Sequence, residues 1–242
     1  MVILSATHLA VRYRNGALGV ADASFSVDAG EIVALFGANG AGKTTSVRAV
    51  TGFLRSEGAR VEHGAVTLFG RDMTNAEPHK ISGLGVAFVP ERSKIFPHLS
   101  VADNLVSVGH LPPRRRRAEV SAFIYELFPA LADRHGVQAG RLSGGQQQML
   151  AIGRCLMTGP QLLILDEMTL GLHHSMHQVL FDAVRHVSDR GTAVLLVDES
   201  TGLALQLASR AYLLSGGVVI DEGPAERFRG SELLAAGYLG QS

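Results

Sequence analysis

The sequence predicts an α/β fold with a mainly parallel core sheet, a small antiparallel β subdomain and a helical subdomain. Continuous apolar runs at 162–166 and 193–198 are typical of parallel strands that are buried on both faces. Between residues 99 and 158, apolar residues recur at spacings of three and four, which indicates helices. Apolar segments on either side of Asn15-Gly16 favour an antiparallel hairpin.

The elements follow one another along a single domain, 1–242, without repeats or a low-complexity linker. In chain order we expect two short strands within 9–27, a strand at 31–36, a helix at 43–51, strands at 64–69 and 85–89, a helical subdomain at 98–158, a strand at 162–166, a helix from about 177 to 189, a strand at 193–198, a hairpin of 211–214 with 218–221, and short helices to Gly240. This alternation of strands and helices is typical of a parallel sheet that is covered on both faces.

The composition indicates a globular protein whose partners are bound at local sites. The chain has 242 residues, 46% of them hydrophobic, which is enough for a sizeable core. Lys plus Arg and Asp plus Glu number 22 each, so no overall charge favours nucleic acid as a partner. A single cysteine, Cys155, suits a reducing compartment. No apolar run approaches the roughly 18 residues of a membrane span, so work at a membrane would require other chains.

A phosphate-binding loop follows the apolar strand at 31–36. The pattern G-x-x-x-x-G-K-[ST] is matched by Gly37, Ala38, Asn39, Gly40, Ala41, Gly42, Lys43 and Thr44. The glycines let backbone N–H groups surround a phosphate, and the next helix presents its positive end to that anion. Lys43 would contact the β and γ phosphates, and the Thr44 hydroxyl would hold Mg²⁺. The pattern therefore predicts a nucleoside triphosphate as ligand.

Two acids end the long apolar strand at 162–166. Asp166 would hold Mg²⁺, directly or through water. Glu167 lies on the other side of the pleat and would polarise the water that attacks the γ phosphate. Together with the phosphate loop, this pair predicts nucleotide hydrolysis.

A second anion site is indicated by Leu142, Ser143, Gly144, Gly145 and Gln146. Ser143 can cap a helix, and Gln146 stands three residues further on, which is the spacing of a capping box. The two glycines expose backbone N–H groups at the positive end of that helix. Because one chain has no use for two such phosphate-binding ends, we expect this one to grip the nucleotide of a partner subunit.

The order of these three motifs resembles that of ATP-binding cassette (ABC) transport ATPases, and the resemblance covers nearly the whole chain. Several stretches are similar to the second ATP-binding subunit of branched-chain amino acid importers, namely 37–45, 89–92, 125–129, 147–154 and 238–240. The resemblance implies the P-loop ABC ATPase fold, with ATP and Mg²⁺ as ligands. It also implies ATP hydrolysis that energises uptake of branched-chain amino acids or a related small polar solute.

The same resemblance implies further site residues and partners. Tyr13 would stack on adenine, Thr45 would join the nucleotide-binding residues, and Glu91 would reach the metal ion. Two cassettes, identical or different, would close over two ATP molecules. They would drive two transmembrane permease subunits, which receive solute from a solute-binding protein and dock on residues 95–99 and the helical subdomain. This arrangement implies a peripheral location on the cytoplasmic face of the plasma membrane.

Three features depart from the family pattern. Met168 stands where the family has proline, and His173-His174 are atypical in the loop that follows. Glu199 stands where the family has a histidine or, in this subfamily, a glutamine that donates to the γ phosphate. An ionised Glu199 would repel that phosphate, since two like charges 4 Å apart at an effective dielectric near 20 cost about 4 kcal/mol. With Lys43 and Glu167 as the other catalytic residues, we expect slow hydrolysis here and most turnover at a partner's site. The alternative function is a nucleotide-gated cassette that dimerises on ATP but scarcely hydrolyses it.

Overall fold

The computed structural model describes residues 1–92, 94–109, 111–199 and 204–229. Its strands are β1 (Val2–Tyr13), β2 (Leu18–Asp28), β3 (Ile32–Phe36), β4 (Ala59–Leu68), β5 (Arg71–Asp72), β6 (Val86–Val89), β7 (Leu162–Asp166), β8 (Ala193–Asp198), β9 (Arg210–Ser215) and β10 (Val218–Pro224). Its α-helices are α1 (Lys43–Thr51), α2 (Pro78–Gly83), α3 (Val101–Val106), α4 (Arg114–Leu127), α5 (Pro129–Ala132), α6 (Gly144–Leu156) and α7 (His174–Asp189). Short 3₁₀ helices are η1 (Phe53–Glu57), η2 (Ala139–Arg141), η3 (Ala204–Gln206) and η4 (Ala225–Phe228).

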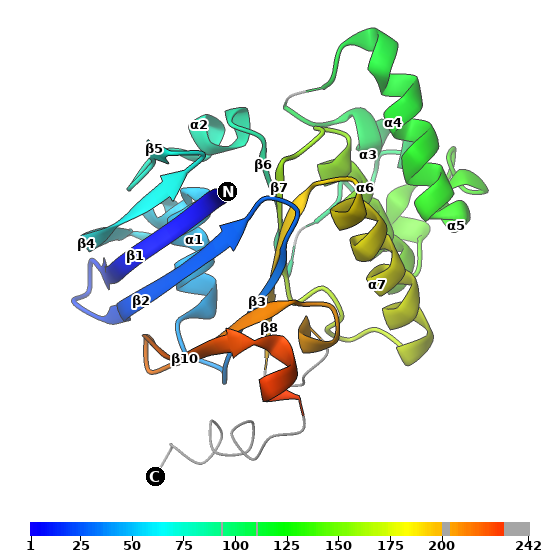
Figure 1. Ribbon diagram of the computed structural model, residues 1–242. Coiled ribbons are helices and arrows are strands. Elements are labelled where there is room, and N and C mark those ends of the chain that lie inside the picture. Colours follow the sequence, from blue (N-terminus) through cyan, green and yellow to red (C-terminus); the bar gives the residue numbers. More distant parts are fainter. Residues whose placement is uncertain (93, 110, 200–203, 230–242) are drawn as a thin grey trace.

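The described strands form one sheet of ten, in the order β5-β4-β1-β2-β10-β9-β3-β8-β7-β6 (Figure 1). Strands β9, β3, β8, β7 and β6 run parallel, which confirms the predicted core. Phe36 at the end of β3 pairs with Asp198 of β8, and Val197 pairs with Asp166 of β7. Because parallel strands end at the same edge of a sheet, this register brings the ends of β3, β8 and β7 together.

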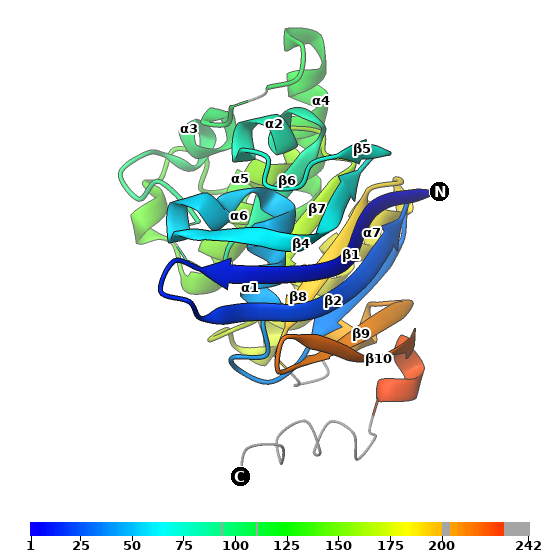
Figure 2. The same ribbon diagram turned by 90° about the vertical axis from the view of Figure 1, so that its left-hand side faces the viewer.

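Strands β1, β2, β4 and β5 form an antiparallel arm that closes over helix α1. Strands β1, β2 and β4 lie across this helix, as Figure 2 shows. Val47 and Val50 of α1 are completely buried in the same apolar cluster as Leu9 of β1 and Val33 of β3. Helix α1 is therefore held between the antiparallel arm and the parallel core, so the residues that precede it have a fixed position.

The first strands are longer than the sequence analysis predicted. Strand β1 begins at Val2 and β4 at Ala59, although the predicted starts are 9 and 64. The pairing of β1 with β4 shifts register after Thr7, close to His8, whose φ is +49°. Gly64 has a φ of +84°, and a Cβ there would stand 2.2 Å from the His8 carbonyl oxygen. This irregularity breaks the period-two pattern, so the strands look shorter in the sequence than they are.

Other bounds agree more closely with the predictions. Helix α1 and strands β7 and β8 begin and end where expected, and β9 pairs with β10 as the predicted hairpin. Helix α7 begins at His174, three residues earlier than expected, since the His173 side chain caps it by accepting from the Ser175 N–H at 3.3 Å. Helix α2 and strand β5 were not predicted. Of the short helices expected up to Gly240, η4 is described, and 230–242 lie outside the described residues.

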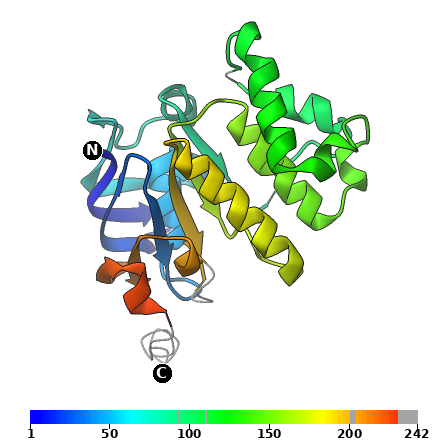
Figure 3. The ribbon, with the colours of Figure 1, turned by 45° about the vertical axis from the view of Figure 1, so that its right-hand side comes forward.

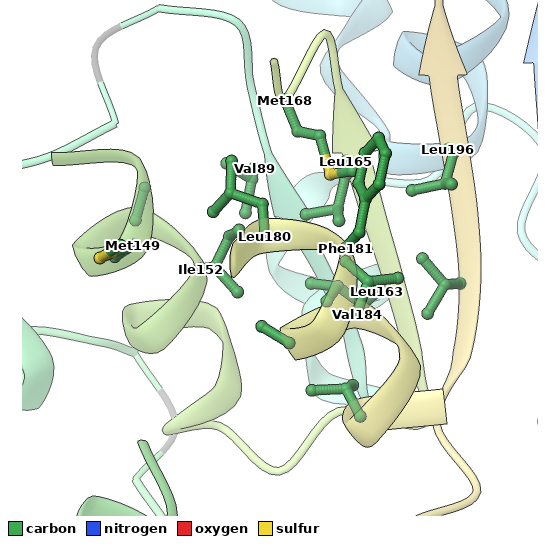
Figure 4. Packing of buried hydrophobic residues seen from close by; sticks show 14 of the residues in the cluster. Val89, Met149, Ile152, Leu163, Leu165, Met168, Leu180, Phe181, Val184 and Leu196 are labelled. Carbon is green, nitrogen blue, oxygen red and sulfur yellow. The ribbon is translucent and has the colours of Figure 1, made fainter. Parts of the chain in front are cut away.

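Helices α3 to α6 all lie within 98–158 and form a lobe beside the sheet, drawn in green in Figure 3. Helices α6 and α7 pack on the sheet through an apolar cluster in which Met149 and Ile152 of α6 face Leu163, Leu180 and their neighbours (Figure 4). Among residues 1–92, 94–109, 111–199 and 204–229, no helix combines the length and apolar character that crossing a membrane requires.

The loop that leads into α3 is fixed by Asn104, which is completely buried. Its side-chain oxygen accepts from the Phe96 N–H at 2.8 Å, and its amide donates to the Phe96 carbonyl at 2.9 Å. The amide also donates to the carbonyls of Leu99, at 3.3 Å, and Ser100, at 3.0 Å. One side chain therefore satisfies four backbone groups of a segment that has no regular secondary structure.

We expect Asn104→Ala to lower the free energy of unfolding by about 2–3 kcal/mol, because buried backbone groups lose their partners. Urea unfolding followed by circular dichroism measures this loss. The control is Asn15→Ala, which removes one exposed turn bond to the Ala17 N–H and should cost less than about 1 kcal/mol. Equal losses in the two variants would contradict the role of Asn104.

Candidate functional site

The predicted phosphate loop connects β3 to α1 and turns tightly between them. A Cβ at Gly37 would stand 2.1 Å from the Leu214 carbonyl oxygen. Gly42, the residue before α1, has a φ of +104°, and a Cβ there would stand 2.8 Å from the Gly19 carbonyl oxygen. Larger residues at these two positions would push the loop away from β2 and β9. In the described structure no side chain caps the start of α1, so its N–H groups remain available to an anion.

Lys43 is 5% exposed and lies over the loop that precedes it. Its ammonium donates to the carbonyl oxygens of Gly37, at 2.8 Å, and Ala38, at 3.1 Å. The positive charge is therefore held at the loop and the helix start, which is where a bound phosphate would need it. The neighbouring Thr44 lines an adjoining cavity of about 730 Å³.

Tyr13 lies at the end of β1, against the start of α1. Its hydroxyl and the hydroxyl of Thr45 are 3.0 Å apart and form a hydrogen bond. A Cβ at Gly19 would stand 2.6 Å from the Tyr13 ring, so the ring packs directly on the backbone of β2. The structure thus brings Tyr13 to the phosphate loop. In this conformation its hydroxyl is hydrogen-bonded to Thr45.

Asp166, at the end of β7, is 4% exposed and lines the same cavity as Thr44 and Glu91. Burial raises the pKa of Asp166 to about 6, and the charges of Glu167 and Glu91 add to this, while Lys43 opposes it. Within the described part of the chain, Oδ1 of Asp166 is buried without a hydrogen-bond partner. A divalent cation suits this position, because it supplies positive charge and takes hard oxygen ligands. Thr44, Asp166 and Glu91 are therefore a chemically suitable set for Mg²⁺.

Glu167 follows Asp166 and leaves the strand in an unusual conformation. Its φ is +48°, in the left-handed region, and its N–H donates to the Val197 carbonyl at 2.8 Å. Burial raises the pKa of Glu167, and the nearby charge of Glu199 and then that of Glu91 raise it further. The left-handed conformation ends β7 before this residue, and the backbone bond places Glu167 beside the end of β8.

Glu199 therefore lies within electrostatic reach of Glu167, as its place after β8 predicts. Asp198, to which the sequence analysis gave no role, has a pKa raised to about 6 by burial and by Glu167. The next residue of this motif, Ser200, lies outside the described residues. The ends of β7 and β8 thus carry four neighbouring acids, Asp166, Glu167, Asp198 and Glu199, and two of them titrate near pH 6.

The second predicted anion site is the start of α6. Ser143 and Gln146 form the predicted capping box: the Gln146 N–H donates to the Ser143 hydroxyl at 3.4 Å, and the Ser143 N–H donates to the Gln146 side chain at 3.1 Å. Leu142 is buried, whereas Ser143 and Gly144 are exposed. Gly145 packs against α7, where a Cβ would stand 2.8 Å from Met176. Among the described residues, no hydrogen bond or ion pair joins this helix start to the phosphate loop.

Met168 occupies the position of the expected proline. It is 6% exposed and packs beside Leu165 and Phe181 in the apolar cluster (Figure 4). The substitution therefore extends the core under the loop after Glu167.

In addition, a lysine that the sequence analysis did not single out, Lys94, lines the cavity together with Glu91 and Asp166. The one signal in the sequence for this position of Lys94 is that it stands three residues after Glu91.

Comparison with known proteins identifies the family and the fold of the chain. The family described as ABC transporter matches residues 20–170. A high-affinity branched-chain amino acid transport ATP-binding protein, BraG of Pseudomonas aeruginosa, is 38% identical over 199 residues, which cover 82% of this chain and 83% of the relative. The lipopolysaccharide export system ATP-binding protein LptB of Haemophilus influenzae is 32% identical over 246 residues, and the match covers 100% of this chain and 98% of the relative.

A solved structure of a nucleotide-free ATP-binding cassette from an ABC transporter superposes with a TM-score of 0.85 at 25% identity, and the match covers 100% of both chains. The predicted P-loop ABC ATPase fold is thereby confirmed. The family match extends from β2 past the acids at the end of β7 and so includes the phosphate loop and the start of α6. This chain belongs to the ABC transporter family and is an ATP-binding cassette ATPase.

Proposed function

We propose that the chain is the ATP-binding and ATP-hydrolysing subunit of an importer for branched-chain amino acids or a related small polar solute. One observation carries the hydrolytic part of the proposal: Lys43 and Thr44, from the loop after β3, lie next to Asp166 and Glu167 at the end of β7. This arrangement places positive charge, a hydroxyl and two carboxylates around the space that a triphosphate would fill.

The nucleotide would be held by residues 37–45, with its β and γ phosphates at the start of α1 and beside Lys43. Thr44, Asp166 and Glu91 would hold Mg²⁺, which when bound offsets the negative charge of the β and γ phosphates. Glu167 would accept a proton from the attacking water, and its raised pKa makes it a stronger base than an exposed glutamate. Tyr13 would stack on adenine after its hydroxyl leaves Thr45.

The exposed start of α6 supports pairing with a second cassette. Ser143 and Gly144 face solvent, and the capping box uses the side chains of Ser143 and Gln146, while among the described residues no partner pairs with the N–H groups of Gly144 and Gly145. A second copy or a related subunit would bring its phosphate loop to this end. Each ATP would then lie between Lys43 of one cassette and Ser143 of the other.

Two transmembrane permease subunits are the proposed partners on another face. The cavity of about 730 Å³ extends from Thr44 and Asp166 to Phe53, Val108 and other residues of both the core and the helical lobe. Near it, the side chains of Phe53 and Phe96 are 41% and 47% exposed. Such an apolar rim suits an inserted helix of a permease. The protein would thus sit peripherally on the cytoplasmic face of the plasma membrane, with a solute-binding protein acting on the other side.

The relatives favour branched-chain amino acids as the solute class, since BraG of Pseudomonas aeruginosa and LivF of Archaeoglobus fulgidus are named for their transport. LptB, which is named for lipopolysaccharide export, is similar over the whole chain, so the cassette alone does not select the solute. The alternative function is a nucleotide-gated cassette that hydrolyses weakly beside a more active partner. The charge of Glu199 next to Glu167 favours that alternative.

We expect Lys43→Met to lower ATP hydrolysis by the assembled complex about 10²-fold, because phosphate stabilisation at the loop is lost. In cells, the same variant should abolish uptake of radiolabelled leucine, isoleucine and valine. The control is Lys80→Met, an exposed lysine of α2, which should leave both measurements unchanged. Normal leucine, isoleucine and valine uptake in the Lys43→Met strain would exclude the proposed importer role.

We expect Glu199→Gln to raise ATP hydrolysis by the assembled complex at least about threefold, because it removes a negative charge beside Glu167 and the γ phosphate. Glu199 raises the pKa of Glu167, so its removal lowers that pKa. The fall in rate on the acid side of the pH profile should therefore move to lower pH. Steady-state rates between pH 5 and 9 measure both effects.

The matched control is Glu226→Gln, whose side chain is 85% exposed on η4. Its rate and pH profile should equal those of the unmodified protein. A Glu199→Gln variant that is no faster than this control would remove the basis for a weakened site.

We expect Tyr13→Phe to bind ATP about fivefold more tightly, because the ring is kept while no hydrogen bond to Thr45 has to break. Tyr13→Ala should bind about tenfold more weakly, since base stacking is lost. Isothermal titration calorimetry measures both affinities, with Tyr125→Phe on α4 as control. Unchanged affinity in both Tyr13 variants would mean that this residue does not meet the nucleotide.

A further inference from the structure

Lys94 is a charged residue of the cavity to which the motifs assign no role. It lies in the segment between β6 and α3, and burial lowers its pKa while Glu91, Asp166 and Glu167 act in the opposite direction. The ammonium group is thus removed from bulk water and lies within electrostatic reach of three carboxylates. A half-buried lysine in such a position costs free energy unless its surroundings hold the charge in place.

Helix α6 holds Lys94 both by its side-chain ammonium group and by its backbone carbonyl. The Lys94 ammonium donates to the side-chain oxygen of Gln148, which is 3% exposed. The Arg154 guanidinium donates to the Lys94 carbonyl at 2.6 Å and lies 4.5 Å from the centre of the Phe96 ring. Arg154 also donates to the Asn104 carbonyl at 3.2 Å, so it joins the Lys94 segment to α3.

Three carboxylates act on the charge of Lys94, namely Glu91, Asp166 and Glu167. Asp166 and Glu167 end a core strand, and Glu91 follows β6. Glu167 and Glu91 raise the pKa of Asp166, Glu91 also raises that of Glu167, and Lys43 opposes this increase for both from the phosphate loop. Lys94 opposes it for Glu167 from the side of α6. Lys43 and Arg48 of the core thus offset the charge of Asp166, and Lys94, which the helical lobe holds, joins Lys43 in offsetting that of Glu167.

We propose that Lys94 is a positioning residue for nucleotide hydrolysis: held by Gln148 and Arg154, its ammonium balances the carboxylates of the acid cluster and makes metal binding there depend on helix α6. The inference rests on the proposed ATPase function. Lys94 and a divalent cation at Asp166 would attract the same carboxylates and repel each other. A metal ion at the site would therefore weaken the attraction between the core and Lys94, and through Gln148 that between the core and α6, the helix that Ser143 caps.

The test is the effect of Mg²⁺ on ATP affinity, measured by isothermal titration calorimetry with excess Mg²⁺ or with EDTA. The ratio of the two affinities should increase at least about threefold in Lys94→Met and in Lys94→Gln, because a charge that opposes the metal ion is gone. Lys94→Arg keeps the charge and should stay within about twofold of the unmodified protein. Lys80→Met removes an exposed lysine and should leave the ratio unchanged.

A double-mutant cycle tests the contribution of α6. Gln148→Met should change the ratio by itself and should have no further effect in a Lys94→Met background, because Gln148 acts on the acids only through Lys94. Ratios in Lys94→Met and Lys94→Gln that equal that of Lys80→Met would overturn the proposal while leaving the ATPase function intact. Absence of ATP binding by the unmodified protein would overturn both.

Discussion

The parallel pairing of β3, β8 and β7 is the constraint on which the site depends. Its register aligns Phe36 with Asp198 and Val197 with Asp166, so that a phosphate-binding loop and a set of acids leave the sheet at one edge. The apolar strands are buried on both faces, by α1 on one side and by α6 and α7 on the other. A slip of one residue would bury the acids in one of these layers, and the register is therefore fixed by the hydrophobic effect.

This edge of the sheet gathers acidic side chains whose negative charge the nearby cations of the protein neutralise only in part. Burial raises the pKa of Asp166 and Asp198 to about 6, and Lys43 and Lys94 offset only part of the repulsion within the group. Such a cluster is unfavourable for an isolated domain and favourable for one that binds a metal–nucleotide complex, since the ligand supplies the missing positive charge. The acid cluster thus lowers the folding stability of the free protein at the place where the metal–nucleotide complex would bind.

Two connections relate the helical lobe to this edge. Asn104 fixes the segment before α3, and Arg154 joins that segment to α6. Because α6 begins with the exposed Ser143 cap and contains Gln148 in the next turn, one rigid helix reaches from a surface suited to a second cassette to the acids of the core. The fold therefore offers a direct physical route between the two nucleotide-contacting ends that we propose.

The sequence by itself determined the elements whose signals are local. Buried parallel strands appear as unbroken apolar runs, the phosphate loop needs glycines at fixed spacing, and the cap of α6 shows as Ser143 and Gln146 three residues apart; each was predicted with nearly correct bounds. The tertiary structure decided what depends on distant pairs. The irregularity at His8 and Gly64, the bond from Tyr13 to Thr45, and the bond from Lys94 to Gln148 all arise from contacts between residues more than 30 positions apart. No periodicity records such contacts, because they form only when the sheet closes over α1 and the lobe packs on α6.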